Sequence, residues 1–240
     1  MAQKLVEKRV LKTYQYDRYD NIRPVMLMNE LQGIADRSAE EMGGGRTYCK
    51  SRGIAWVVTH YYIDILEMPR ANEELTFSTW SSGSEGIRAM RDFTIHGSNN
   101  RLMVRATSQW VLLDLQTRRP LRLKENLQNW DYLPERAWNR EFTKCTDFKA
   151  EKQHIFKCRY DDIDANQHIN NAVYVTWATE SVGFEYRNTH KLRGIEIYFE
   201  HEISADTTEV QIDVALDAHK TMHRICVNGE TKAHIVCFWD

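Results

Sequence analysis

The sequence contains no apolar run that approaches the roughly 20 residues a helix needs to cross a bilayer. Residues 1–8 also lack the apolar stretch of a secretory signal peptide. Neither sign of charge is in excess, because 32 Lys and Arg residues against 34 Asp and Glu give a net charge of −2. These absences argue against a membrane-spanning protein and against a general nucleic-acid or membrane-surface binder. We therefore expect the chain in the cytoplasm.

Several motifs that carry chemistry are also missing. There is no G-x-S-x-G, and Gly43-Gly44-Gly45 lacks the Lys-Ser/Thr of a phosphate-binding loop. His201-Glu202 has no second His four residues on, so no zinc site is indicated. We expect no metal and no cofactor. The number of cysteines is odd, and no two of them lie at metal-ligand spacing. We expect all five to be free thiols, mostly buried. They are Cys49, Cys145, Cys158, Cys226 and Cys237.

Apolar residues are plentiful enough, at 42% of the 240 residues, for one large domain or two of ordinary size. The first half predicts a strand over 5–16 and then a helix over 24–42, which Pro24 would begin and the three glycines at 43–45 would end. Four strand-like runs rich in β-branched and aromatic residues follow, near 54–65, 74–81, 87–96 and 102–114. One helix followed by several strands is typical of an α+β fold with an antiparallel sheet.

The second half repeats this order. A strand is predicted over 153–160, a helix over 170–187, and strands near 194–202, 207–217, 221–227 and 231–239, the last two joined at Asn228-Gly229. A Tyr-Asp-x-x-Asp motif precedes each helix, at 16–20 and at 160–164. Residues 116–150 are charged and aperiodic. We therefore predict two similar domains, 1–115 and 151–240, joined by a linker over 116–150.

The halves diverge just after this motif. Only the second places Asp164, Asn166, His168, Asn170 and Asn171 within eight residues, on a loop that enters a helix. An Asp can act as a base or nucleophile, an Asn amide can donate to a carbonyl, and a His titrates near neutral pH. The free N–H groups of a helix N-terminus can hold a developing oxyanion. Asp and Asn are also ordinary cap residues, so the cluster alone does not establish a site.

The segment from Asp162 to Asn171, followed by Tyr174 and Trp177, resembles the signature of the acyl-acyl carrier protein thioesterases. The resemblance implies two tandem hotdog domains, each a long helix wrapped by an antiparallel β-sheet, in the α+β class. It also implies hydrolysis of fatty acyl-acyl carrier protein thioesters, which terminates fatty acid synthesis. A shorter form of the motif occurs in hotdog enzymes that cleave acyl-CoA, so acyl-CoA hydrolysis remains an alternative, as does a non-catalytic acyl or carrier-protein binding module.

In this family a Glu on the strand after the second helix completes the site, often beside a Cys. By the resemblance Glu202 is that carboxylate and Ile203 stands where the Cys would be. Ile cannot supply a thiolate, which favours carboxylate chemistry. Glu200 stays an alternative to Glu202, because residues two apart on a strand share a face.

The expected mechanism uses four groups. Asn166 and the helix N-terminus polarise the thioester carbonyl, and His168 orients Asp164 or the water. Asp164 attacks the carbonyl or assists a water that does, and Glu202 is the general base. A covalent intermediate and direct attack by water both stay open.

The substrate implies two further regions. By the resemblance the acyl chain lies in the N-terminal domain, where Met28, Trp56 and Trp110 are candidates, and Asn171 is a candidate substrate contact near the catalytic group. Acyl carrier protein is acidic, so its docking face should be basic. Residues 86–124 hold eight Lys or Arg against two Asp, and the candidates for docking are Arg88, Arg91, Arg118, Arg119, Arg122 and Lys124. A homodimer is possible.

Overall fold

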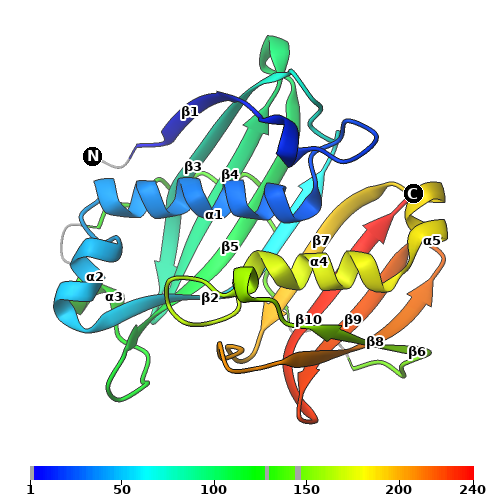
Figure 1. Cartoon of the computed structure of the whole chain (residues 1–240). Helices are drawn as coiled ribbons and strands as arrows, with labels where there is room; N and C mark the ends of the chain where they lie inside the picture. The colour runs from blue at the N-terminus through cyan, green and yellow to red at the C-terminus, as the bar shows by residue number, and fades with distance from the viewer. Residues whose placement is uncertain (1–2, 128–129, 144–146) are drawn as a thin grey trace. The chain divides into compact units, whose positions relative to one another are not determined.

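The computed structural model describes residues 3–127, 130–143 and 147–240. The chain divides into two compact units. The N-terminal unit comprises Met1–Arg23 and Asn29–Phe142, and the C-terminal unit comprises Pro24–Met28 and Thr143–Asp240. Each unit contains a long helix beside an antiparallel sheet, as Figure 1 shows.

In the N-terminal unit the strands hydrogen-bond in the order β1-β3-β4-β5-β2, and every neighbouring pair is antiparallel. The long helix α1, of which Asn29–Glu41 belongs to this unit, begins at Pro24, whose fixed φ suits the first turn, and it ends before Gly43, which has a positive φ of 75°. The element bounds are β1 Leu5–Val10, α1 Pro24–Glu41, α2 Arg46–Arg52, β2 Ile54–Ile65, β3 Glu74–Glu85, β4 Arg88–His96, β5 Leu102–Asp114 and α3 Leu123–Asn126.

The C-terminal unit has the same plan, with strand order β7-β10-β9-β8-β6 and antiparallel neighbours. Asn228 and Gly229, both with positive φ, form the two-residue turn between β9 and β10. The bounds are β6 Lys152–Lys157, α4 Asn171–Ser181, α5 Phe184–Thr189, β7 Leu192–Phe199, β8 Glu209–Asp217, β9 Lys220–Val227 and β10 Glu230–Trp239. The shared plan confirms the predicted α+β class.

Three predicted elements differ from the structure. The strand predicted over 5–16 ends at Val10, and a 3₁₀ turn occupies Thr13–Gln15. The helix predicted over 170–187 is two helices, because Gly183 has a φ of 85° and interrupts it. Strand β7 ends at Phe199, so Glu200 and Glu202 do not lie on a strand as expected.

The internal repeat has a different register from the one that the Tyr-Asp-x-x-Asp motif suggested. The motif aligns Asp20 with Asp164, but the backbone hydrogen bonds align Asp17 with Asp164. The N–H of Asp17 donates to the carbonyl of Asn21, and the N–H of Asp164 donates to the carbonyl of His168, at 2.8 Å in both cases. A five-residue motif rich in turn formers recurs easily, whereas a set of matching hydrogen bonds defines the equivalent positions.

Up to Phe142 the segment between the two repeats belongs to the N-terminal unit, whereas Asp147 and Phe148 contact Arg224 of the C-terminal unit. Arg136 forms a 2.9 Å ion pair with the fully buried carboxylate of Asp92, and the Trp80 indole donates to the Glu135 carbonyl at 2.7 Å. A buried carboxylate needs such a partner, because an unpaired charge is costly to bury. The assignment of 116–150 as a linker between domains at 1–115 and 151–240 stays a prediction.

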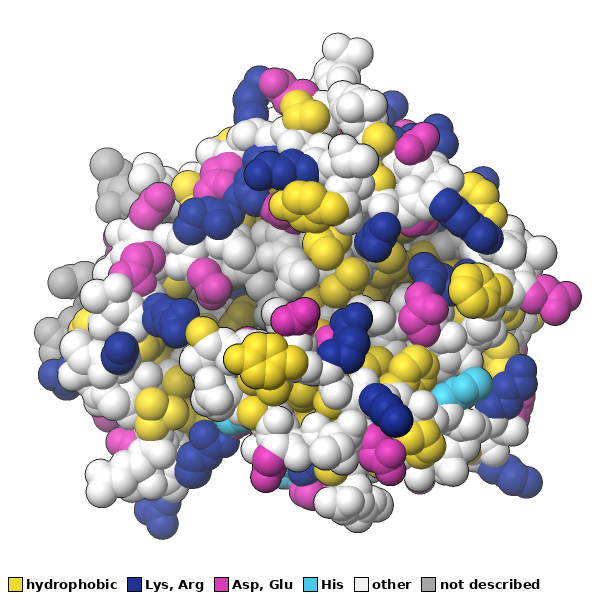
Figure 2. Space-filling view, viewed as in Figure 1, with side chains coloured by type: hydrophobic (Ala, Val, Ile, Leu, Met, Phe, Trp, Pro, Cys, Tyr) yellow, Lys and Arg dark blue, Asp and Glu magenta, His cyan; other side chains and the backbone are white. Residues whose placement is uncertain are grey.

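Charged side chains of both signs are interspersed on the face seen in Figure 2, in keeping with the small net charge. Among the described residues, no helix is long and apolar enough to span a membrane. Cys49, Cys226 and Cys237 are buried free thiols and Cys158 is a partly buried one, while Cys145 lies outside the described residues.

Candidate functional site

The turn before α4 is built on the carboxylate of Asp164. Its Oδ1 accepts the backbone N–H of Asn166 at 2.7 Å and that of His168 at 3.3 Å. Gln167, between them, has a positive φ of 64°, so the chain reverses tightly. The turn gathers Asp164, Asn166 and His168 into one cluster, with the Asn166 side-chain amide 3.5 Å from Oδ2 of Asp164.

Glu202 reaches this cluster from a loop after β7. Its Oε2 lies 2.7 Å from Nε2 of His168, and the two side chains are 25% and 37% exposed. The structure therefore brings together the four residues that the sequence proposed as catalytic. Their position at a partly exposed surface leaves them accessible to water and to a substrate.

Two backbone hydrogen bonds hold the Glu202 loop against the turn. The N–H of Ile169 donates to the Ile203 carbonyl at 2.9 Å, and the N–H of Ala205 donates to the Gln167 carbonyl at 3.1 Å. His168 also forms an isolated β-bridge with Ser204. Because these bonds lie on either side of the His168–Glu202 contact, the side-chain pair rests on a fixed backbone.

Glu200 has a different partner. Its Oε1 lies 3.1 Å from Nε2 of His234 on β10, whereas Glu202 contacts His168. The two carboxylates do not share a strand face, because β7 ends before both. The geometry therefore favours Glu202 over Glu200 as the partner of His168.

The N-terminus of α4 is less open to a ligand than the sequence suggested. Asn170 caps the helix, and its side-chain oxygen accepts the N–H of Ala172 at 2.9 Å. The N–H of Val173 donates to the Asn170 carbonyl at 2.9 Å. The N–H of Asn170 donates to the Asp162 carbonyl at 2.8 Å, so three of the four N–H groups without a partner inside the helix are already used. Asn171 stands at the first helical position.

No thiol occupies the position beside Glu202. Ile203 is buried there, and its backbone hydrogen-bonds to the hydroxyl of Tyr174. Tyr174 lies beneath the site, where burial above all raises the pKa of its hydroxyl, so it stays protonated at neutral pH. Burial also raises the pKa of the nearby Cys158 thiol, which makes it a poor nucleophile.

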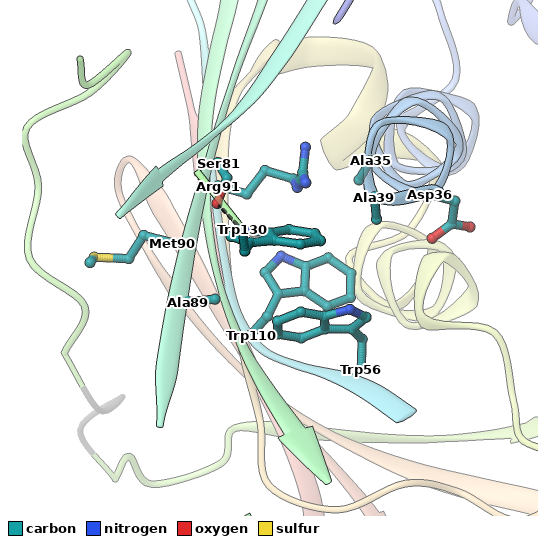
Figure 3. Close-up of a pocket in the computed structure, with 10 residues that line it drawn as sticks. All are labelled: Ala35, Asp36, Ala39, Trp56, Ser81, Ala89, Met90, Arg91, Trp110 and Trp130. Carbon is teal, nitrogen blue, oxygen red and sulfur yellow. Dashed lines mark hydrogen bonds between the residues drawn. The ribbon is translucent and has the colours of Figure 1, made fainter. Parts of the chain in front are cut away.

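The N-terminal unit holds a pocket between α1 and the sheet, shown in Figure 3. Trp56 and Trp110, two of the expected acyl-slot residues, line it. Met28 does not; it is fully buried and lies two turns before Ala35, which does line the pocket. The lining residues are Ala35, Asp36, Ala39, Trp56, Ser81, Ala89, Met90, Arg91, Trp110 and Trp130. Trp130 was not among the residues expected in the acyl slot, because it lies in the aperiodic segment between the repeats.

Arg91 is a correction to the expected docking set. It is only 6% exposed, and its guanidinium donates to the hydroxyls of Ser38 at 2.9 Å and Thr79 at 3.2 Å. Burial lowers its pKa to about 10, so it stays charged at neutral pH. Arg91 therefore holds α1 to the sheet and cannot contact an external carrier protein.

The other docking candidates lie at one end of the N-terminal sheet. Arg88 on β4 pairs with Val111 on β5. Leu113, two residues further along β5, forms a β-bridge with Pro120, which directly follows Arg118 and Arg119 in the sequence. All the remaining candidates are exposed: Arg88, Arg118, Arg119, Arg122 and Lys124. Among the described residues, no cluster of three or more His, Cys, Asp or Glu could hold a metal ion.

Several known structures share this fold. An oleoyl thioesterase from Lactobacillus plantarum matches 99% of this chain and 96% of its own at a TM-score of 0.89 and 24% identity. A 12:0-ACP thioesterase from Umbellularia californica matches 99% of this chain and 97% of its own at a TM-score of 0.88 and 19% identity. At these identities the likeness shows the fold, and it supports the expected pair of hotdog-like repeats.

Curated relatives include plant enzymes. Oleoyl-acyl carrier protein thioesterase 1 of Arabidopsis thaliana is 26% identical over 220 residues, which cover 83% of this chain and 60% of the relative. The palmitoyl-acyl carrier protein thioesterase of Gossypium hirsutum is 29% identical over 215 residues, which cover 80% of this chain and 50% of the relative. The chain thus spans only 50–60% of the length of these two relatives.

Two family models match in succession. The acyl-ACP thioesterase N-terminal domain matches residues 3–130, and the acyl-ACP thioesterase C-terminal domain matches residues 145–240. The second match contains the cluster of Asp164, Asn166, His168 and Glu202, and the first contains the pocket with its three tryptophans. The chain therefore belongs to the acyl-ACP thioesterase family.

Proposed function

We propose that the protein hydrolyses fatty acyl thioesters carried on acyl carrier protein, releasing a free fatty acid and the carrier thiol. The observation that carries the proposal is the 2.7 Å contact between His168 and Glu202 beside the carboxylate of Asp164. A carboxylate–imidazole pair next to a second carboxylate can move a proton and position a nucleophile. Membership of the acyl-ACP thioesterase family makes an acyl thioester the matching substrate.

Each residue has a proposed role. The Asn166 side chain donates an N–H to the thioester carbonyl oxygen, where negative charge develops in the tetrahedral intermediate. Glu202 accepts a proton from the attacking water, and His168, held by Glu202, orients that water or Asp164. The C–S bond then breaks, and the leaving thiolate takes up a proton to become the carrier thiol.

Asp164 has two possible parts in this scheme. Its Oδ1 is engaged by two backbone N–H groups, whereas Oδ2 faces the Asn166 amide at 3.5 Å. The Oδ2 atom is therefore the one that would attack the carbonyl or assist the water. The N–H groups of Asn166 and His168 hold this carboxylate in place, and Asn171 is proposed to contact the substrate.

The proposed carrier contact is the exposed group of Arg88, Arg118, Arg119, Arg122 and Lys124. A basic face attracts the acidic carrier protein and raises its rate of encounter. Acyl-CoA is the alternative substrate, and a binding module without turnover is the alternative from another class. Location in the cytoplasm and a homodimer stay predictions, to be tested by cell fractionation and light scattering.

The test is thiol release from a panel of acyl-acyl carrier proteins and matching acyl-CoAs, with three proteins compared. These are the wild type, Asp164→Asn, and Asp17→Asn as the matched control in the other repeat. We expect turnover on carrier protein substrates in the wild type and the control, and its loss in Asp164→Asn.

Near-wild-type turnover in Asp164→Asn would contradict the role of this carboxylate. Faster release from acyl-CoA would favour the alternative substrate. No release from either carrier by folded wild-type protein would favour a binding module.

A further inference from the structure

The indole of Trp130 lies between two pockets of the N-terminal unit. It lines the pocket between α1 and the sheet, of about 40 Å³, together with Trp56 and Ala39. It also lines a second pocket of about 380 Å³, together with Tyr48 of α2 and Leu127. Both pockets are partly open to solvent. Trp130 is the residue common to the two linings, so its side chain forms part of the wall that separates them.

The ring is fixed in this position by three contacts. Its Nε1 donates to the Ser81 hydroxyl at 2.9 Å. It contacts the ring of Trp56, with ring centroids 5.7 Å apart and the planes tilted by 45°. Gly44 lies so close that a Cβ there would be 2.4 Å from the ring. Only a glycine permits this approach, so the wall depends on both residues.

The two sides of the wall differ in character. The first pocket is apolar where Trp56, Trp110 and Trp130 meet, and Asp36 and Arg91 line it elsewhere, as Figure 3 shows. The second includes the polar side chains of Arg52, Glu125 and Asn126. Burial on the apolar side would stabilise an acyl chain, and a chain that extended from the first pocket into the second would have to pass the indole.

We propose that Trp130 limits the length of the acyl chain that this protein accepts, by separating the first pocket from the space beyond it. The inference rests on the proposed function, in which the first pocket holds the acyl chain. Removing the indole joins the two pockets and admits a longer chain. A specificity-determining residue thus lies in the segment between the repeats rather than on α1 or the sheet.

The experiment compares the wild type, Trp130→Ala and Trp130→Phe on saturated acyl-acyl carrier proteins of increasing length. We expect the chain length with the highest kcat/KM to increase in Trp130→Ala. Each further methylene that becomes buried should raise kcat/KM about fourfold. Trp130→Phe keeps most of the wall and should stay close to the wild type. Trp138→Ala is the control, because Trp138 lies in the same segment but does not line the first pocket.

A second readout separates this inference from the proposed function. Free fatty acids of the same lengths are titrated into Asp164→Asn and into the double variant with Trp130→Ala, and binding is followed by calorimetry. Trp130→Leu replaces Trp130→Ala if the latter does not fold. Tighter binding of longer chains only when the indole is removed supports the inference even without turnover. An unchanged length preference in folded variants, or an equal loss at every length, overturns it.

Discussion

The turns that precede α1 and α4 have the same backbone and different chemistry. In the first, Oδ1 of Asp17 accepts the N–H groups of Tyr19 at 2.8 Å and Asn21 at 3.1 Å. In the second, Oδ1 of Asp164 accepts those of Asn166 and His168 at 2.7 and 3.3 Å. The carboxylate therefore builds the turn in both repeats, whether or not catalysis follows.

The adjoining loop is also repeated. The N–H of Ile22 donates to the Pro69 carbonyl as that of Ile169 donates to the Ile203 carbonyl, at 2.9 Å in both. Met68 is consequently the counterpart of Glu202, and Asn21 is the counterpart of His168. The comparison teaches that the His–Glu pair, rather than the Asp, distinguishes the proposed catalytic repeat from the other.

The largest expected effect comes from giving the second turn the side chains of the first. His168→Asn, or Glu202→Met, should lower kcat about 10²–10⁴-fold, because the proton-transfer pair is lost. Thiol release measures the effect, and circular dichroism checks the fold. Glu202→Gln keeps the shape of the side chain and removes its negative charge, so it shows whether the charge is what kcat depends on. The reverse changes, Asn21→His and Met68→Glu, should leave kcat unchanged. A variant at His168 with wild-type kcat would refute the comparison.

The second prediction concerns the shared structural role of the two aspartates. Asp17→Ala and Asp164→Ala should each lower the free energy of unfolding by about 0.5–1.5 kcal/mol, since two backbone N–H groups at a partly exposed turn exchange the carboxylate for water. The Asn variants keep an acceptor oxygen and should lose only a small part of this. Denaturant unfolding measures both. A large loss at only one of the two positions would mean that the turns are not equivalent.

The third prediction compares the polar groups that face the two long helices. Arg91 on β4 bonds to Ser38 of α1, and His223 on β9 lies 3.0 Å from the Ser181 hydroxyl of α4. Burial lowers the pKa of His223 from its ordinary 6.5 to about 3, with the nearby His154 adding to the shift. Between these values the unfolded chain binds one more proton than the folded protein.

The free energy of unfolding should therefore fall as the pH is lowered from 6.5 towards 3, by up to about 1.4 kcal/mol per pH unit from this group. His223→Gln should reduce that slope, and His219→Gln, at an exposed position, should not. The comparison of slopes removes the contribution of the carboxylates. Arg91 stays charged throughout this range and adds no slope. An unchanged slope in folded His223→Gln would contradict a neutral buried imidazole.

The smallest expected effect concerns the carrier protein. Arg118→Glu with Arg122→Glu should raise KM for acyl-acyl carrier protein about tenfold and change kcat little, because steering acts on encounter. The effect should weaken with salt. Lys149→Glu with Lys191→Glu, in the C-terminal unit, is the control with the same change in net charge. Equal changes of KM for acyl-CoA would argue against a docking role.

Much of the fold could be predicted because its signals are local. Pro24 and Gly43 bound α1, alternation marks the strands, and Asn228-Gly229 forms the predicted hairpin turn. The prediction was wrong where a helix or strand stops although the regular pattern of apolar residues continues. Gly183 interrupts an otherwise helical run, and β7 stops before Glu200.

The candidate site shows the same division. Asp164, Asn166 and His168 lie within five residues, so their proximity follows from the chain itself. The proximity of Glu202 to His168 does not follow from the chain itself, because Glu202 lies in a loop more than thirty residues later. The backbone hydrogen bonds of Ile169 and Ala205 bring that loop to the turn.

The sequence by itself determined the α+β class, the repeat, and the cluster before the second helix, since composition, periodicity and neighbouring residues carry that information. Only the tertiary structure decided that Arg91 is buried rather than exposed like the other docking candidates, that Asp17 is the counterpart of Asp164, and that Trp130 lines two pockets. The physical reason is that burial and pocket walls depend on contacts between residues far apart in the chain, which no local pattern encodes.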